Sequence, residues 1–196
     1  MITNAIEILK KGGIIALPTE TVYGLAVDMT NENAIKKLYE LKKRNANKSF
    51  AIAISGIDAL RKIVKKIPEK ALILIKYFWP GPLTLVLEAG DNVPSYLISN
   101  GKIGIRNPKN KTTLDIIKKL GNPVALTSAN ISGKQSCKSG DEVKEVFGRQ
   151  IDMVVENREK ILGVESTVVD ITDSEPKILR EGYISKYEIA VCLHRK

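Results

Sequence analysis

Short apolar runs that end in polar loops recur along this 196-residue chain and alternate with amphipathic helical segments. The first run, residues 14–17, is typical of a buried strand, and Pro18 ends it because proline lacks the N–H that a sheet requires. Similar runs predict strands at residues 50–54, 83–87, 103–106, 124–126, 153–155, 167–171 and 178–179. Apolar residues at helical spacing predict helices over residues 3–11, 34–41, 60–67, 113–120 and 143–147, with two more beginning at Pro68 and Ser185.

This alternation predicts a single α/β domain over residues 1–196, because no linker, repeat or low-complexity segment interrupts it. The strands expected between residues 151 and 180 have no helices between them, so part of the sheet should be antiparallel. We therefore expect a mixed parallel and antiparallel sheet with flanking helices. Gly24 is expected to turn the chain after the first polar loop.

Lysine and arginine outnumber the acids by 31 to 22, which gives a formal charge of +9 and favours anionic partners such as nucleotides or nucleic acid. A basic balance also occurs in proteins that bind neither. No apolar run approaches the roughly 18 residues of a membrane span, so we expect a cytoplasmic protein. The distant Cys137 and Cys192 are expected to be free thiols, and no zinc-binding spacing is present.

Several catalytic signatures are absent from the sequence. It contains no GxxxxGK[ST] or GxGxxG loop, no HExxH and no GxSxG, and its one histidine, His194, argues against a Ser–His–Asp hydrolase. An enzyme of this composition would depend on positioning and charge neutralisation, as nucleotidyl transfer does.

Four loops at strand ends carry groups suited to binding, and ligands in open α/β sheets sit beyond the carboxyl ends of strands. Together they contain Thr19, Glu20, Thr21 and Tyr23; Arg106; Thr127, Ser128 and Asn130; and Glu165, Ser166 and Thr167, with Arg180 nearby. If the sheet gathers these loops, they form a cleft for a ligand with a carboxylate and phosphates. An ordinary polar turn explains the first loop equally well.

A second feature places six cations within thirteen residues: Lys36, Lys37, Lys42, Lys43, Arg44 and Lys48. Spacing alone favours a solvated helix face with cations at its C-terminal end. A phosphate-binding group is the alternative.

Seven ordered motifs resemble the YrdC/Sua5 family of threonylcarbamoyl-AMP synthases. They are PTETVYGL (18–25), LKKR with Lys48 (41–48), WPGPLTLVL (79–87), GIRNP (104–108), TSANISG (127–133), ESTVVDI (165–171) and ILREG (178–182). The resemblance implies a twisted sheet with a concave, positively charged cleft. It also implies the conversion of L-threonine, bicarbonate and ATP, with Mg²⁺ on the nucleotide, to threonylcarbamoyl-AMP and pyrophosphate.

Site roles are implied by the same motifs. Threonine would bind to Thr21, Arg106, Leu126 and Ser166, and ATP to Arg44, Lys48, Lys102, Ser128, Ser136 and Arg180. Lys42, Arg44, Ser128 and Asn130 match the family's catalytic KxR and SxN signature, and no protein metal site is implied. A partner transferase complex would then modify tRNA position 37, and binding to tRNA or double-stranded RNA is a further expectation.

The sequence also departs from the family pattern. Asn45 and Ser49 stand where many relatives have proline, and Ala53 lies near a position at which long members carry a histidine for threonine. The chain ends soon after ILREG, so we expect the short, single-domain form, which has no second domain to close the nucleotide site.

Two other functions remain open at this point. One is a module that binds double-stranded RNA or the ribosome without catalysis, whose binding would weaken steeply with salt. The other is a paralogue that makes a different carbamoyl-adenylate, which the amino-acid dependence of ATP–pyrophosphate turnover would reveal.

Overall fold

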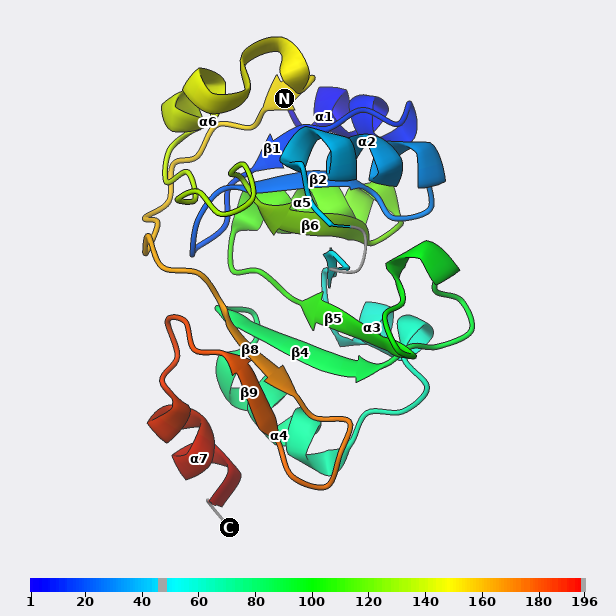
Figure 1. Cartoon of the computed structure of the whole chain (residues 1–196), viewed down its shortest axis with the longest axis vertical. Coiled ribbons are helices and arrows are strands. Elements are labelled where there is room, and N and C mark those ends of the chain that lie inside the picture. The colour runs from blue at the N-terminus through cyan, green and yellow to red at the C-terminus, as the bar shows by residue number, and fades with distance from the viewer. Residues whose placement is uncertain (46–48, 195–196) are drawn as a thin grey trace.

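The strands pair in the order β7-β1-β2-β6-β3-β5-β4-β8-β9 in a computed structural model that describes residues 1–45 and 49–194 (Figure 1). Their bounds are β1 Ile15–Leu17, β2 Gly24–Asp28, β3 Ala51–Ala53, β4 Leu83–Glu88, β5 Lys102–Arg106, β6 Val124–Ser128, β7 Met153–Val154, β8 Thr167–Asp170 and β9 Lys177–Arg180. β1–β7, β3–β5 and β4–β8 are parallel pairs, whereas the other neighbours are antiparallel. The expected mixed sheet is therefore confirmed.

Several of the helices begin at polar caps that the sequence offers. Their bounds are α1 Ile2–Lys10, α2 Glu32–Lys42, α3 Ile57–Ile63, α4 Glu69–Phe78, α5 Lys111–Leu120, α6 Gly140–Phe147 and α7 Lys186–His194, with short 3₁₀ turns η1 Ser95–Leu97 and η2 Gly148–Gln150. Asn31 Oδ1 accepts a hydrogen bond from Ala34 N at 3.0 Å, and Ser139 Oγ accepts one from Glu142 N at 3.1 Å. Each cap satisfies a backbone donor that the first helical turn leaves unpaired.

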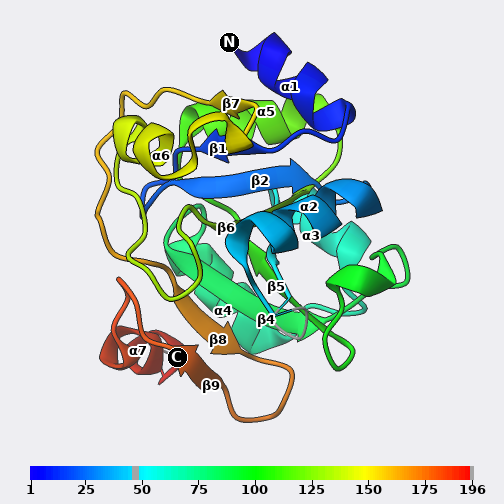
Figure 2. The same cartoon turned by 45° about the horizontal axis from the view of Figure 1, so that its top comes forward.

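Two apolar cores hold the helices against the sheet. In the smaller core, α1 and α5 cover β1, β2 and β6, with Leu9 and Ile116 among the fully buried side chains. In the larger core, apolar side chains of the other helices pack on the opposite face of these three strands and on the rest of the sheet. The sheet is strongly twisted. Figure 2 shows the twist, since β2 runs across the view whereas β4, β8 and β9 descend obliquely. This twist leaves a hollow between the two halves of the sheet, where the site described below lies.

The structure corrects two predictions. Gly24 does not turn the chain but begins β2, a strand that the sequence pattern did not reveal. A Cβ atom at Gly24 would lie 2.7 Å from Leu126 Cδ1, so this glycine allows close packing between β2 and β6. The helix expected over residues 60–67 ends at Ile63, because Val64 is extended and pairs with Ala89.

Other sequence expectations concern the chain as a whole. None of the helices within the described ranges is long and apolar enough to cross a membrane. Cys137 and Cys192 are buried free thiols, and His194 is exposed at the end of α7. The register of the central strands matters most for function, because it places Thr84 of β4 opposite Arg106 of β5.

Candidate active site

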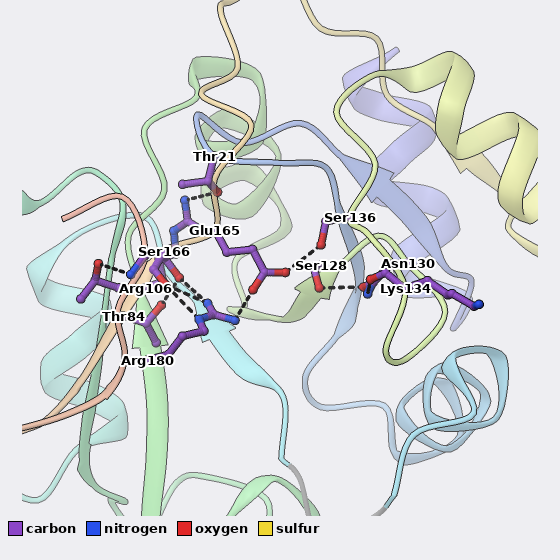
Figure 3. Close-up of polar contacts among 12 residues, drawn as sticks. Thr21, Thr84, Arg106, Ser128, Asn130, Lys134, Ser136, Glu165, Ser166 and Arg180 are labelled. Carbon is purple, nitrogen blue, oxygen red and sulfur yellow. Dashed lines mark hydrogen bonds and ion pairs between the residues drawn. The ribbon is translucent and has the colours of Figure 1, made fainter. Parts of the chain in front are cut away.

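A cavity of about 510 Å³ lies in the hollow of the twisted sheet. The residues predicted to share one site come from separate segments, and eight of them line this cavity: Thr21, Arg44, Lys102, Arg106, Leu126, Ser128, Ser166 and Arg180. Figure 3 shows several of these side chains converging from the ends of β5, β6 and β9 and from the start of β8. The structure therefore gathers the loops as the sequence analysis required.

Arg106 anchors one end of the cavity. Its Nη2 atom donates to Thr21 Oγ1 at 2.8 Å (Figure 3). The same atom donates to Glu20 Oε1, also at 2.8 Å. The loop after β1 holds Thr21 in place, because Thr19 Oγ1 accepts hydrogen bonds from the amides of Thr21 and Val22. Arg106 Nε is buried and has no hydrogen-bond partner within the described residues. A carboxylate ligand would satisfy that donor.

Ser166 and Arg180 lie beside Arg106 across the sheet. Ser166 Oγ is 2.9 Å from Thr84 Oγ1, and Arg180 Nη2 donates to Ser166 O at 2.8 Å and to Ser166 Oγ at 3.1 Å. Arg180 Nη1 also forms an ion pair with Glu165, whose other oxygen accepts from Ser136 Oγ at 2.7 Å (Figure 3). Ser136 thus lies outside the cavity lining and reaches it through Glu165.

Arg44 enters the cavity from the segment after α2. Its Nη2 atom donates to Ser49 O at 3.2 Å, and its guanidinium carbon lies 5.4 Å from the ring centroid of Phe50. Burial lowers the pKa of Arg44, and the charge of Arg180 acts in the same direction. The two arginines line the same cavity. Lys48, predicted beside Arg44, lies outside the described residues.

Lys42, the last residue of α2, points away from solvent and does not line the cavity. Its Nζ atom donates to Ser128 O, to Asn130 O at 3.0 Å and to Asn130 Oδ1 at 2.9 Å. Burial, followed by the charge of Arg44, lowers the pKa of Lys42 to about 8. Asn130 also lies outside the lining, and its Oδ1 accepts from Ser128 Oγ at 2.8 Å. Lys42 and Asn130 thus reach the cavity through Ser128.

Lys102 lies at the far end of β5 from Arg106. Its Nζ atom is 2.9 Å from Asp170 Oδ2, and this contact raises the pKa of Lys102. Burial favours a higher pKa for Asp170, but hydrogen bonds from Thr172 and Lys102 outweigh it and lower that pKa. The cavity therefore has a fixed ion pair at this end.

The roles implied by the family motifs leave out four residues that shape the cavity: Glu20, Thr84, Glu165 and Asp170. Glu20 and Glu165 each directly precede a residue predicted to bind threonine, and this position was the one sequence signal for them. Their pairing with arginines could not be predicted, because those arginines lie far along the chain. Within the described ranges, no group of three His, Cys, Asp or Glu residues could hold a metal ion.

The fold and this cavity define an α/β protein with a concave ligand site in which Arg44, Lys102, Arg106 and Arg180 face two carboxylates. The chain belongs to the Sua5/YciO/YrdC family, whose model, described as "Telomere recombination", matches residues 7–182.

Relatives of known function support this membership. Threonylcarbamoyl-AMP synthase of Pyrococcus abyssi is 42% identical over 92% of this chain and 54% of its own length. A putative threonylcarbamoyl-AMP synthase of Methanocaldococcus jannaschii is 33% identical over 96% of this chain and 91% of its own. The crystal structure of P. abyssi Sua5 complexed with L-threonine aligns with a TM-score of 0.94 and 39% identity, over 98% of this chain and 57% of that one. The chain thus spans about half the length of the P. abyssi relative.

Proposed function

We propose that this chain is an L-threonylcarbamoyladenylate synthase. It takes L-threonine, bicarbonate and ATP and releases threonylcarbamoyl-AMP and pyrophosphate. The product serves a tRNA-modifying transferase that makes N6-threonylcarbamoyladenosine at position 37, which sets the reaction in the cytoplasm. Similarity to the P. abyssi and M. jannaschii proteins supports this assignment.

One observation carries the proposal. Arg44, Arg106, Ser128, Ser166 and Arg180 come from five separate segments and line one cavity. Two anionic substrates must meet in this reaction, and a shared cavity lined by cations lowers the repulsion between them. We assign all the described residues to a single domain that carries out this reaction.

Two groups of residues in the cavity suit the two substrates. Arg106 binds the threonine carboxylate, with Thr21 and Ser166 providing hydroxyls and Leu126 an apolar wall. Arg44, Lys102, Ser128 and Arg180 receive the phosphates of ATP, and Arg180 stands at the boundary because it also donates to Ser166. The family motif adds Lys48, which lies outside the described residues. Lys42, Asn130 and Ser136 are positioning residues in this scheme, because each reaches the cavity through another side chain.

The chemistry follows from this arrangement. The threonine amine takes up CO₂ derived from bicarbonate and loses a proton to form a carbamate. A carbamate oxygen then attacks the α-phosphorus, the bond between the α-phosphorus and the α,β-bridging oxygen breaks, and pyrophosphate leaves with that electron pair. Arg44 and Arg180 neutralise charge that builds up on the phosphates. Magnesium enters with the nucleotide as part of the substrate, which fits a cavity whose carboxylates, Glu165 and Asp170, already bind Arg180 and Lys102.

The test is to incubate the protein with ATP, bicarbonate and each of several amino acids. Among the amino acids tested, we expect only threonine to support pyrophosphate release and to give an adenylate with the mass of threonylcarbamoyl-AMP. Arg44→Ala should abolish this release while the protein remains folded, and Lys37→Ala, which removes an exposed cation of α2, should not. Release that does not depend on threonine, or that survives Arg44→Ala, would refute the assignment.

A further inference from the structure

Arg180 faces the cavity with its guanidinium already engaged. Its Nε and Nη2 atoms donate to Ser166 O at 3.1 and 2.8 Å, Nη2 also donates to Ser166 Oγ, and Nη1 pairs with Glu165. These contacts occupy most of the five N–H donors of a guanidinium. A phosphate that binds Arg180 through more than one hydrogen bond therefore takes the place of an existing partner.

Glu165 is the partner that can be exchanged. The Ser166 carbonyl is backbone at the start of β8, whereas Glu165 is a side chain that lines the cavity. The side chains of Arg180 and Glu165 are 46% and 33% exposed, compared with 8% and 10% for Arg106 and Glu20. An ion pair open to solvent is weak, so a polyanion can break it at little cost.

The Glu165 carboxylate also lies within electrostatic reach of the other cations at this end. Burial is the main cause that lowers the pKa of Lys42 and of Arg44, and the Glu165 charge opposes that lowering in both residues. One carboxylate thus acts on Arg44 and Arg180, two of the cations to which the phosphates are assigned. The Glu165 carboxylate therefore occupies the position that an anionic ligand of these cations would take.

We propose that Glu165 competes with phosphate groups for Arg180 and thereby promotes the release of pyrophosphate. The proposal rests on the proposed function, which makes pyrophosphate a product of this cavity. On nucleotide binding, Arg180 Nη1 exchanges Glu165 for a phosphate oxygen. After the reaction, Glu165 returns to Arg180 as pyrophosphate leaves, so no bond is made or broken other than hydrogen bonds and ion pairs.

The experiment measures binding of sodium pyrophosphate by calorimetry, with and without Mg²⁺, to the full chain and to Glu165→Gln. Glutamine keeps the shape of the side chain and a hydrogen-bond acceptor for Ser136 but removes the charge. We expect the variant to bind pyrophosphate about fivefold more tightly, the size of one partly exposed ion pair. The dissociation constant for L-threonine, which is assigned to the Arg106 end, should stay unchanged.

Glu175→Gln is the matched control, because Glu175 pairs with Lys70 at 3.7 Å on the surface and its side chain is 90% exposed. This variant should bind pyrophosphate like the unaltered protein. Unchanged or weaker pyrophosphate binding in Glu165→Gln would overturn the proposal, and so would no binding by either protein. If Glu165→Gln binds more tightly but the unaltered chain makes no adenylate, the competition stands and the synthase assignment fails.

Discussion

Glu20 lies behind Arg106, and each of its carboxylate oxygens accepts one hydrogen bond at 2.8 Å, from Arg106 Nη2 and from Lys109 N. Both side chains of the ion pair are buried. Glu20 therefore fixes Arg106 without entering the cavity lining, and it also holds the backbone that follows β5. Arg180, in contrast, has a half-exposed partner in Glu165.

This relationship makes Glu20 a positioning residue whose loss affects both stability and threonine binding. Glu20→Ala leaves the Arg106 charge buried without its carboxylate, so the free energy of unfolding should fall by about 3 kcal/mol. The KM for threonine should rise much more than the KM for ATP. Urea denaturation and steady-state kinetics measure the two effects. Glu175→Ala, which breaks an exposed pair, should cost under about 1 kcal/mol, and equal losses in the two variants would contradict the argument.

Local sequence patterns predicted the cavity lining well. Arg106, Ser128 and Arg180 each end a strand, and strand ends are visible as apolar runs followed by polar residues. The sheet order, which brings those ends together, could not be derived from spacing. The contact of Glu20 could not be derived either, because its arginine partner is 86 residues away and only the folded sheet brings the two together.

Two other features were hidden for physical reasons. Lys42 stands in the last turn of a helix, where a cation is normally solvated, and its burial depends on the packing of the distant segment that contains Ser128 and Asn130. β2 was missed because Gly24 is typical of turns. Its role becomes clear only once Leu126 is known to pack against it.

The buried lysine gives a prediction about pH. The pKa of Lys42 in the folded protein is about 8, below the ordinary value of 10.5, so between these values the unfolded chain binds more protons at this residue. Stability contributed by this group should therefore rise with pH across that window, by up to about 3 kcal/mol. Urea denaturation at pH 7 and pH 10 measures the change. In Lys42→Met the rise should disappear, and parallel pH dependences of the two proteins would contradict the assigned pKa.

Two glycines that both face neighbouring strands should respond differently to alanine. A Cβ at Gly24 would lie 2.7 Å from Leu126 Cδ1 and 3.2 Å from Thr127 O, so Gly24→Ala should lower the free energy of unfolding by about 1–3 kcal/mol. A Cβ at Gly104 would meet nothing closer than Thr84 Cγ2, at 3.6 Å. Gly104→Ala should therefore remain stable but weaken substrate binding, because its methyl group enters the cavity. Gly24 also lines the cavity, so thermal unfolding is the measurement that separates the two variants, and comparable destabilisation would refute the packing argument.

The hydroxyl of Thr84 gives the sharpest test of the threonine end. Thr84 Oγ1 and Ser166 Oγ are buried and 2.9 Å apart, so the pair orients the Ser166 hydroxyl toward the cavity. Thr84→Val keeps the shape of the side chain and removes this hydrogen bond. The KM for threonine should rise about fivefold, as expected for a net loss of roughly 1 kcal/mol, while the KM for ATP changes little. Thr30→Val is the control, because Thr30 Oγ1 donates to Asp28 Oδ1 at 2.7 Å and Thr30 does not line the cavity. A rise in both KM values, or the same threonine effect in the control, would show that Thr84 acts on the fold rather than on Ser166.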